Sequence, residues 1–314
     1  YGGRLFAMDV GGRIGAYDAE TGEPKWKNQL RTEEEEGTLG GGIALNGARL
    51  YITTGFSEVA ALESASGDIV WRRKLSNPMR SAPTVRDGRV FVVTIANELF
   101  ALSMADGKTV WSHSGYSEVA NLVGGASPAV DSGIVIVPYS SGEIVALRVE
   151  NGRVVWRDTL PPLQRTDPIT SLAHVRGRPV IDRGRVFVIG NSGRMVAIDL
   201  RTGYRLWEKA IGGVHGPWVA GEYIFVLSNN SEVICLLRRD GRVKWISKLQ
   251  QFEDEEDRED PIYWAGPVLA GDRLLITGRG GSAPAFFVRR GSAHPAHRTS
   301  RHVRARIVFP GPTD

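Results

Sequence analysis

The chain has 314 residues, of which 42% are hydrophobic, and a formal net charge of +4 at pH 7. This length is sufficient to bury a large core. The single cysteine excludes an intramolecular disulfide, and no apolar run reaches the ~18 residues that a transmembrane helix needs. Glycine is abundant, with 38 residues, and no long stretch has helical amphipathic periodicity. The composition therefore indicates a turn-rich, all-β fold.

The positive charge is concentrated at one end of the sequence. Residues 279–314 hold seven arginines and one aspartate, whereas residues 1–278 hold 32 basic and 34 acidic side chains. A slightly acidic body offers no basic stripe that could follow a phosphate backbone. We therefore expect no nucleic-acid binding.

The first predicted elements are a hairpin over residues 4–18 and a strand that ends at Trp26. The innermost strand of this unit would precede Tyr1, so we expect the first blade to lack it. The same arrangement, an alternating apolar run, a glycine turn and a tryptophan four residues after the glycine, recurs along the chain. The six copies are Gly22/Trp26, Gly67/Trp71, Gly107/Trp111, Gly152/Trp156, Gly203/Trp207 and Gly241/Trp245. Consecutive tryptophans lie 38 to 51 residues apart, a period typical of β-propeller blades.

Residues 195–207 show the physical role of one copy. Side chains of residues 195–200 alternate between two strand faces, and Gly203 can adopt the positive φ of a tight hairpin. A buried indole such as that of Trp207 removes ~150–250 Å² from water, which one hairpin cannot provide alone. We therefore predict that stacked blades bury these tryptophans as structural residues. Cys235 stands where the other copies have alanine, which indicates a small buried side chain.

A complete blade is predicted over residues 81–112. Its strands are expected at 81–85, 89–94, 98–102 and 108–112, and four antiparallel strands per unit are typical of propeller blades. Three segments interrupt this pattern. They are a Glu- and Gly-rich stretch at 33–42, an insertion at 161–176 and an acidic insertion at 252–260. None has a phosphate-loop ending or an alternating calcium-binding pattern, so we interpret the acidic stretches as solvated loops.

The blade pattern fails after Gly278. We expect residues 1–280 to form an incomplete propeller of about six blades and part of a seventh, and residues 281–314 to form an Arg-, Pro- and His-rich tail. The tail is interpreted as a disordered extension or a segment translated out of frame. No rigid element is expected to hold its histidines, His294, His297 and His302, so no metal site is assigned to them. The chain begins within a strand pattern and without an initiator methionine, which predicts a fragment.

Residues 145–147 and 197–203, with the Gly-x-x-x-Trp hairpins, resemble the repeats of the pyrroloquinoline-quinone-type propeller superfamily. The inter-blade segments 121–128 and 172–179 more closely resemble those of the BamB family, lipoproteins of the outer-membrane β-barrel assembly machinery. The resemblance covers residues 1–280 and implies an eight-bladed propeller on the periplasmic face of the outer membrane. Its lipid anchor and signal would lie outside this chain. It also implies a non-catalytic scaffold that docks on a BamA-type assembly protein and contacts nascent outer-membrane proteins.

The resemblance further points to the residues that contact the partner. Family members have a Leu-x-Leu-Arg phrase in the first loop, where this chain has Ala120, Leu122 and Val123. They have an Asp-x-Asp phrase in the second loop, where this chain has His174 and Arg176. The candidate partner-binding residues are therefore Leu122, Val123, His174 and Arg176. We assign no catalytic, cofactor-binding or metal-binding residue.

Two other functions remain open at this point. One is a quinone-dependent dehydrogenase of the same superfamily, which would need a quinone-stacking platform, calcium ligands and often a vicinal disulfide that one cysteine cannot form. The other is the sensing propeller of a larger protein. No Ser/His/Asp or Cys/His arrangement falls within a recognisable motif, so the sequence favours a binding scaffold.

Overall fold

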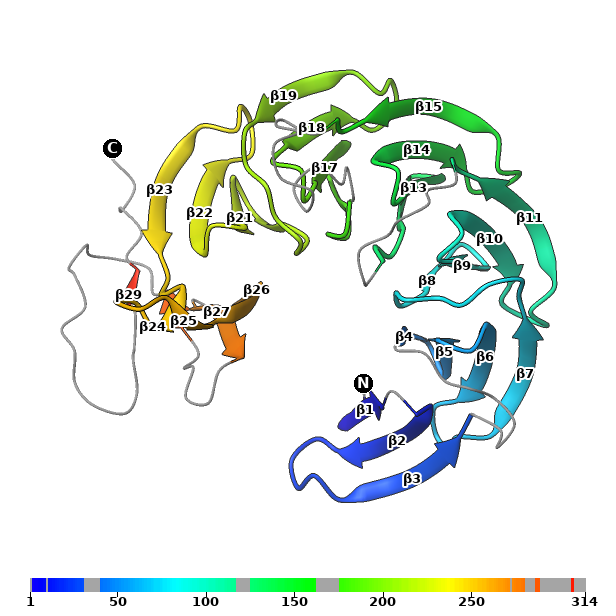
Figure 1. Ribbon diagram of the computed structural model, residues 1–314. Coiled ribbons are helices and arrows are strands. Elements are labelled where there is room, and N and C mark those ends of the chain that lie inside the picture. The colour runs from blue at the N-terminus through cyan, green and yellow to red at the C-terminus, as the bar shows by residue number, and fades with distance from the viewer. Residues whose placement is uncertain are drawn as a thin grey trace.

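The computed structural model describes residues 2–9, 11–30, 40–116, 125–161, 175–271, 273–279, 286–288 and 306–307. In this part of the chain, antiparallel sheets follow one another around an arc, with the first strand of each four-stranded sheet toward the centre and a later strand at the outer edge (Figure 1). The predicted four-stranded blades are present. No helix among the described residues is long and apolar enough to cross a membrane.

The first sheet has three strands among the described residues, β1 (Arg4–Met8), β2 (Arg13–Asp18) and β3 (Pro24–Gln29). The second and third sheets are β4 (Gly41–Asn46), β5 (Arg49–Thr54), β6 (Glu58–Glu63) and β7 (Ile69–Lys74), then β8 (Thr84–Arg86), β9 (Arg89–Val93), β10 (Glu98–Ser103) and β11 (Thr109–Ser114). The fourth and fifth are β12 (Ala129–Asp131), β13 (Ile134–Pro138), β14 (Glu143–Arg148) and β15 (Val154–Thr159), then β16 (Val180–Asp182), β17 (Arg185–Ile189), β18 (Met195–Asp199) and β19 (Arg205–Lys209). The sixth is β20 (Trp218–Ala220), β21 (Tyr223–Leu227), β22 (Glu232–Leu237) and β23 (Val243–Lys248).

The last sheet contains β26 (Tyr263–Ala270), β27 (Arg273–Arg279), β28 (Phe286–Val288) and β29 (Arg306–Ile307), and its final pair is parallel. The short strands β28 and β29 fall in the predicted tail, whose other residues, including the three histidines, lie outside the described part of the chain. The acidic insertion differs from the expected loop, because it forms the hairpin of β24 (Phe252–Asp254) and β25 (Glu259–Pro261). The side chains of residues 253–261 are exposed, so the charges are solvated as expected.

One register recurs within the blades. In the second sheet, Ala61 of the third strand lies opposite Tyr51 on one side and Trp71 on the other. The methyl side chain leaves room for the two rings, whose centroids are 6.0 Å apart. Cys235 takes the same position beside Trp245 and is buried, as predicted. Burial raises the pKa of its thiol to about 12, so the thiol stays protonated at neutral pH.

The glycine and the tryptophan of one hairpin serve two different blade interfaces. Gly67 has a φ of +82°, and a Cβ there would lie 2.6 Å from the indole of Trp26 in the preceding blade. The Nε1 of Trp26 donates a hydrogen bond to the carbonyl of Ser64, 3.1 Å away. The same two contacts, a glycine against the ring and a carbonyl that accepts from Nε1, are made by Trp71 with Gly107 and Met104, Trp111 with Gly152 and Val149, Trp156 with Gly203 and Leu200, and Trp207 with Gly241 and Arg238. The repeat therefore joins each blade to the next.

The hydrophobic core lies between blades. Each of the six clusters of buried residues in the described chain is shared by two consecutive sheets. One of them, for example, combines Ile136 and Trp156 of the fourth sheet with Val186 and Val188 of the fifth. Blades therefore stabilise one another through nearest-neighbour contacts, as expected for repeat architectures.

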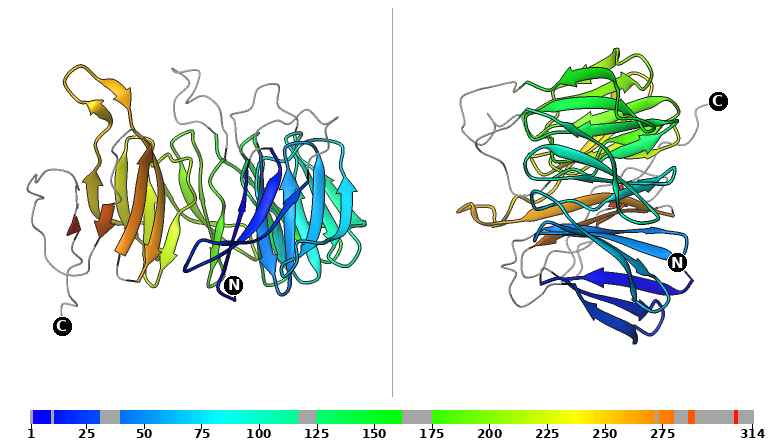
Figure 2. Two further views of the ribbon diagram at one scale, coloured as in Figure 1. Left: turned by 90° about the horizontal axis from the view of Figure 1, so that it is seen from below. Right: turned by 90° about the vertical axis from the view of Figure 1, so that its right-hand side faces the viewer.

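The strand order gives the arc two distinct sides. In a blade of four antiparallel strands, the outer strand ends on the side where the next inner strand begins, so every connection between blades lies on one side. We call this side the connection face. The hairpin β24–β25 projects from this face (Figure 2). The same face carries the described ends of three inter-blade segments, which are Leu30 and Gly40, Tyr116 and Gly125, and Pro161 and Val175. We call the opposite side the turn face. It carries the tight turns of the Gly-x-x-x-Trp hairpins.

Candidate partner-binding face

The described ends of the two loops that were predicted to contact a partner lie on the connection face. Leu122, Val123 and His174 lie outside the described residues, so their positions stay predictions. Arg176 is described and exposed, and it precedes β16. The residues at both ends of each loop are also described, and they show how the loops are held.

Asn97 fastens the start of the first loop. This residue lies in the turn between β9 and β10, has a φ of +57° and is 4% exposed. Its Nδ2 donates to the carbonyl of Tyr116 at 2.7 Å, and its Oδ1 accepts from the Ser140 amide at 3.0 Å and the Ser140 hydroxyl at 2.9 Å. Asn97 thus ties the third blade to the loop and to the fourth blade. One asparagine in a turn carries no periodic signal in the sequence, so Asn97 was not among the predicted residues.

A second group beneath the same loop start contains titratable side chains. Glu143 is buried and accepts from the Tyr116 amide at 2.9 Å and from Arg157 Nη1 at 3.4 Å. His113 Nδ1 lies 2.8 Å from the Tyr139 hydroxyl, and the two rings are stacked. Burial and then the Arg157 charge lower the pKa of His113, while the Glu143 charge opposes them. Burial, followed by the Glu143 charge, raises the pKa of Tyr139.

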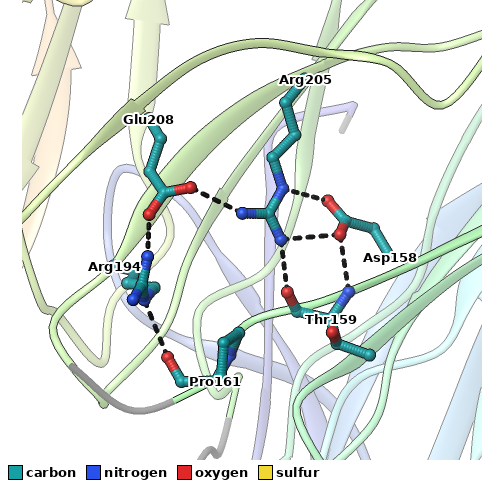
Figure 3. A network of polar contacts seen from close by, with 6 residues as sticks. All are labelled: Asp158, Thr159, Pro161, Arg194, Arg205 and Glu208. Atoms are coloured by element: carbon teal, nitrogen blue, oxygen red, sulfur yellow. Dashed lines mark hydrogen bonds and ion pairs between the residues drawn. The ribbon is translucent and has the colours of Figure 1, made fainter. Parts of the chain in front are cut away.

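The start of the second loop is fixed by the ion-pair network in Figure 3. Arg205 Nε and Nη2 donate to the two carboxylate oxygens of Asp158 at 2.8 and 2.7 Å, and Nη1 donates to Glu208 at 2.6 Å. Glu208 also accepts from Arg194, whose Nε donates to the Pro161 carbonyl at 2.9 Å. Hydrogen bonding to Asp158 raises the pKa of Arg205. The network therefore links the fourth and fifth blades to the first residue of the loop.

The end of the second loop is packed tightly against the next blade. Val175 is buried in the core between the fourth and fifth sheets. A Cβ at Gly177 would lie 2.9 Å from the backbone of His215, so only glycine fits this approach. His215 Nε2 lies 2.9 Å from the Trp264 carbonyl, at the start of the seventh blade. Burial lowers the pKa of His215, the Trp264 hydrogen bond opposes this shift, and the Arg176 charge adds to it.

A small cavity lies between the ends of the two loops. Its volume is about 30 Å³, and it is lined by residues of both loop ends, by the Asn97 anchor and by the start of the third blade. These residues include Arg80, Asn97, Ala126, Ser140 and Val175. The described ends of the two loops, at Gly125 and Val175, therefore lie beside one cavity of the connection face, although they are about 50 residues apart in the sequence.

The observed blades define the class of protein. Four-stranded antiparallel sheets around an arc, joined by a repeated tryptophan that donates to the next blade, form a β-propeller with pyrroloquinoline-quinone-like repeats. A family model described as outer membrane protein assembly factor BamB matches residues 2–247. The chain belongs to this family, as the sequence resemblance predicted.

Individual relatives agree with this assignment. Outer membrane protein assembly factor BamB of Yersinia pestis is 27% identical over 91% of this chain and 82% of its own length. The Salmonella typhimurium BamB is 29% identical over 85% of this chain and 69% of its own length. The crystal structure of BamB from Moraxella catarrhalis superposes with a TM-score of 0.78 at 20% identity, covering 91% of this chain and 82% of that one. The predicted all-β propeller fold is confirmed.

The fold is also shared with enzymes. A quinohemoprotein alcohol dehydrogenase from Comamonas testosteroni superposes with a TM-score of 0.56 at 16% identity, over 73% of this chain and 46% of its own. At this identity the likeness concerns the fold alone. Within the described residues, no group of three or more His, Cys, Asp or Glu side chains is placed to hold a metal ion.

Proposed function

We propose that this protein is a non-catalytic scaffold in outer-membrane protein assembly, which docks through its connection face on a BamA-type assembly protein. The observation that carries this proposal is that the described ends of two separately anchored loops line one cavity in a chain of the BamB family. Buried side chains and ion pairs fix the described loop ends. An arc of packed blades that holds the loop ends at fixed separations would lower the ordering cost of binding.

The proposed contact residues are Leu122, Val123, His174 and Arg176. Leucine and valine would supply apolar contact area, whereas His174 and Arg176 stand where the family phrase has two acids. This chain therefore presents a more basic second loop than the family phrase does. The proposed location is the periplasmic face of the outer membrane, with a lipid anchor outside this chain.

Nascent outer-membrane proteins are proposed as a second kind of partner. The outer strand of each of the first six sheets, such as β7 and β15, pairs with only one neighbour, so one edge of its backbone stays free among the described residues. An unpaired edge can accept a further strand through main-chain hydrogen bonds.

Co-purification from cells that contain the BamA-type protein of the same organism tests docking. We expect the wild-type chain to retain that protein and the double variant Leu122→Glu/His174→Glu to lose it. Tyr204→Glu is the matched control, because Tyr204 is 75% exposed on the turn face. Urea unfolding of each variant verifies folding. Failure of the wild type to retain the assembly protein would show that the proposed docking is wrong. Cross-linking in cells that never captures a nascent outer-membrane protein would show that the second proposed partner is wrong.

A further inference from the structure

Arginines at the inner rim of the two faces differ in their partners. On the turn face, Arg183 pairs with Glu222 at 3.1 Å, and Arg86 lies 3.9 Å from Asp131. On the connection face, Arg80, Arg176 and Arg178 make no ion pair with any described acid. Arg176 and Arg178 both precede the inner strand β16. At the inner rim of the connection face, these three arginines are therefore not paired with a described acid, in contrast to those of the turn face.

Arg80 is the most constrained of these side chains. Three arginines in the described chain bury Nε without a hydrogen-bond partner, namely Arg80, Arg89 and Arg238. The terminal nitrogens of Arg238 bond to Asp182 and Glu222, and Nη1 of Arg89 donates to a carbonyl. For Arg80, Nε is buried without a hydrogen-bond acceptor, and the guanidinium makes no ion pair with a described acid. A buried N–H of a charged group without an acceptor is costly, and a bound carboxylate would relieve that cost.

The surroundings of Arg80 suit one carboxylate. Arg80 lines the cavity of about 30 Å³ between the loop ends, which is enough for about two water molecules and so for one small planar anion. No Asp or Glu is among the residues that line it. The Oδ1 and Nδ2 of Asn97 are already engaged by Ser140 and Tyr116, so the guanidinium is the strongest free donor there.

Arg176 extends the positive charge along the rim. It follows Val175 of the cavity lining and lies close enough to His215 to lower the pKa of that imidazole. Arg178 packs beside Gly216 of the next blade. Both side chains are exposed, so they would attract an approaching acidic segment rather than bury it.

We propose that the connection face contains a carboxylate-binding site, in which Arg80 receives one Asp or Glu side chain of a partner polypeptide while Arg176 and Arg178 steer the acidic segment toward it. This inference rests on the proposed docking function for the identity of the partner. The site itself is defined by residues of this chain.

The site can be tested without the partner. The whole chain, labelled with ¹⁵N-arginine, is titrated with a tetraglutamate peptide and, in parallel, with sodium chloride of equal ionic strength. The Nε signal of Arg80, assigned by its loss in Arg80→Lys, should shift with the peptide and not with the salt, and the paired Arg86 should not shift. The proposal would be overturned if the peptide caused no specific shift of the Arg80 signal. It would also be overturned if the chain self-associated without peptide and this association covered Arg80.

Binding kinetics with the periplasmic part of the assembly protein distinguish carboxylate binding by Arg80 from electrostatic steering by Arg176 and Arg178. Arg80→Gln should speed dissociation about tenfold or more, because a desolvated charge pair acts mainly on dissociation. Arg176→Gln/Arg178→Gln should slow association and flatten its salt dependence, and Arg183→Gln on the turn face is the matched control. Unchanged kinetics in a folded Arg80→Gln variant would refute the site while leaving docking intact. A peptide-induced shift at Arg80 without any wild-type binding to the assembly protein would refute the docking function and leave the site.

Discussion

The turn face and the connection face belong to the same strands, but only one of them is repetitive. On the turn face, five successive tryptophans donate to the next blade at 2.8 to 3.1 Å. On the connection face, the segments between outer and inner strands range from 8 residues, before β20, to 20 residues, before β16. Their anchors also differ, since Asn97 holds one loop and Arg205 another. Repetition thus marks the residues that stabilise the arc of blades, and its absence marks the side that we propose for partner binding.

The largest expected effect concerns the turn face. Trp156 is 8% exposed, belongs to the core between the fourth and fifth sheets, and donates to the Leu200 carbonyl at 2.8 Å. Trp156→Ala should lower the free energy of unfolding by about 3–5 kcal/mol, because it opens a cavity between two blades. Tyr204→Ala, at a 75% exposed aromatic of the same face, should change it by less than about 0.5 kcal/mol. Urea denaturation measures both, and equal effects would contradict the structural role of the repeat.

How much of this arrangement the sequence could predict depends on repetition. The Gly-x-x-x-Trp hairpins predicted the blades, and the alanines at the position of Cys235 predicted a small buried side chain there. The sequence could not show that Trp156 packs on Gly203 rather than on its own Gly152, because a pattern within one hairpin does not name its neighbour in space. Asn97 and Arg80 occur once each, so only the structure relates them to the loops. Leu122, Val123 and His174 stay predictions.

Two turn-face glycines, Gly203 and Gly184, distinguish the cost of a left-handed backbone from the cost of a blocked contact between blades. Gly203 and Gly184 have φ values of +76° and +72°, but a Cβ at Gly203 would lie 2.6 Å from the Trp156 ring, whereas nothing lies within 4 Å of one at Gly184. Gly184→Ala should cost about 1–2 kcal/mol for the left-handed backbone alone. Gly203→Ala should cost about 1–3 kcal/mol more, because the blades must separate to admit the methyl group. Thermal and urea unfolding of the two variants provide the difference, and an equal loss would show that the glycine serves the backbone only.

The smallest expected effect concerns the connection face and pH. Burial lowers the pKa of both His113 and His215 below the usual value of 6.5. Below about pH 6.5, the unfolded chain therefore binds more protons at these histidines than the folded chain does. The free energy of unfolding should consequently fall as the pH drops from about 6.5 toward the lower folded pKa. Both histidines are partly solvated, so the loss should stay well under the ~1.4 kcal/mol per pH unit that one proton allows.

Urea unfolding at several pH values, for the wild type and for His113→Gln/His215→Gln, measures this loss. The double variant should lose the slope between pH 6.5 and pH 5 and keep the steeper decline at lower pH. That decline belongs to aspartates whose pKa values are lowered mainly by hydrogen bonds in turns, namely Asp9, Asp18, Asp106, Asp199 and Asp240. All but Asp9 lie in turn-face hairpins, so acid should weaken the connection face first and the turn face only below about pH 4. If the variant keeps the wild-type slope near pH 6, the two faces do not differ in their response to acid.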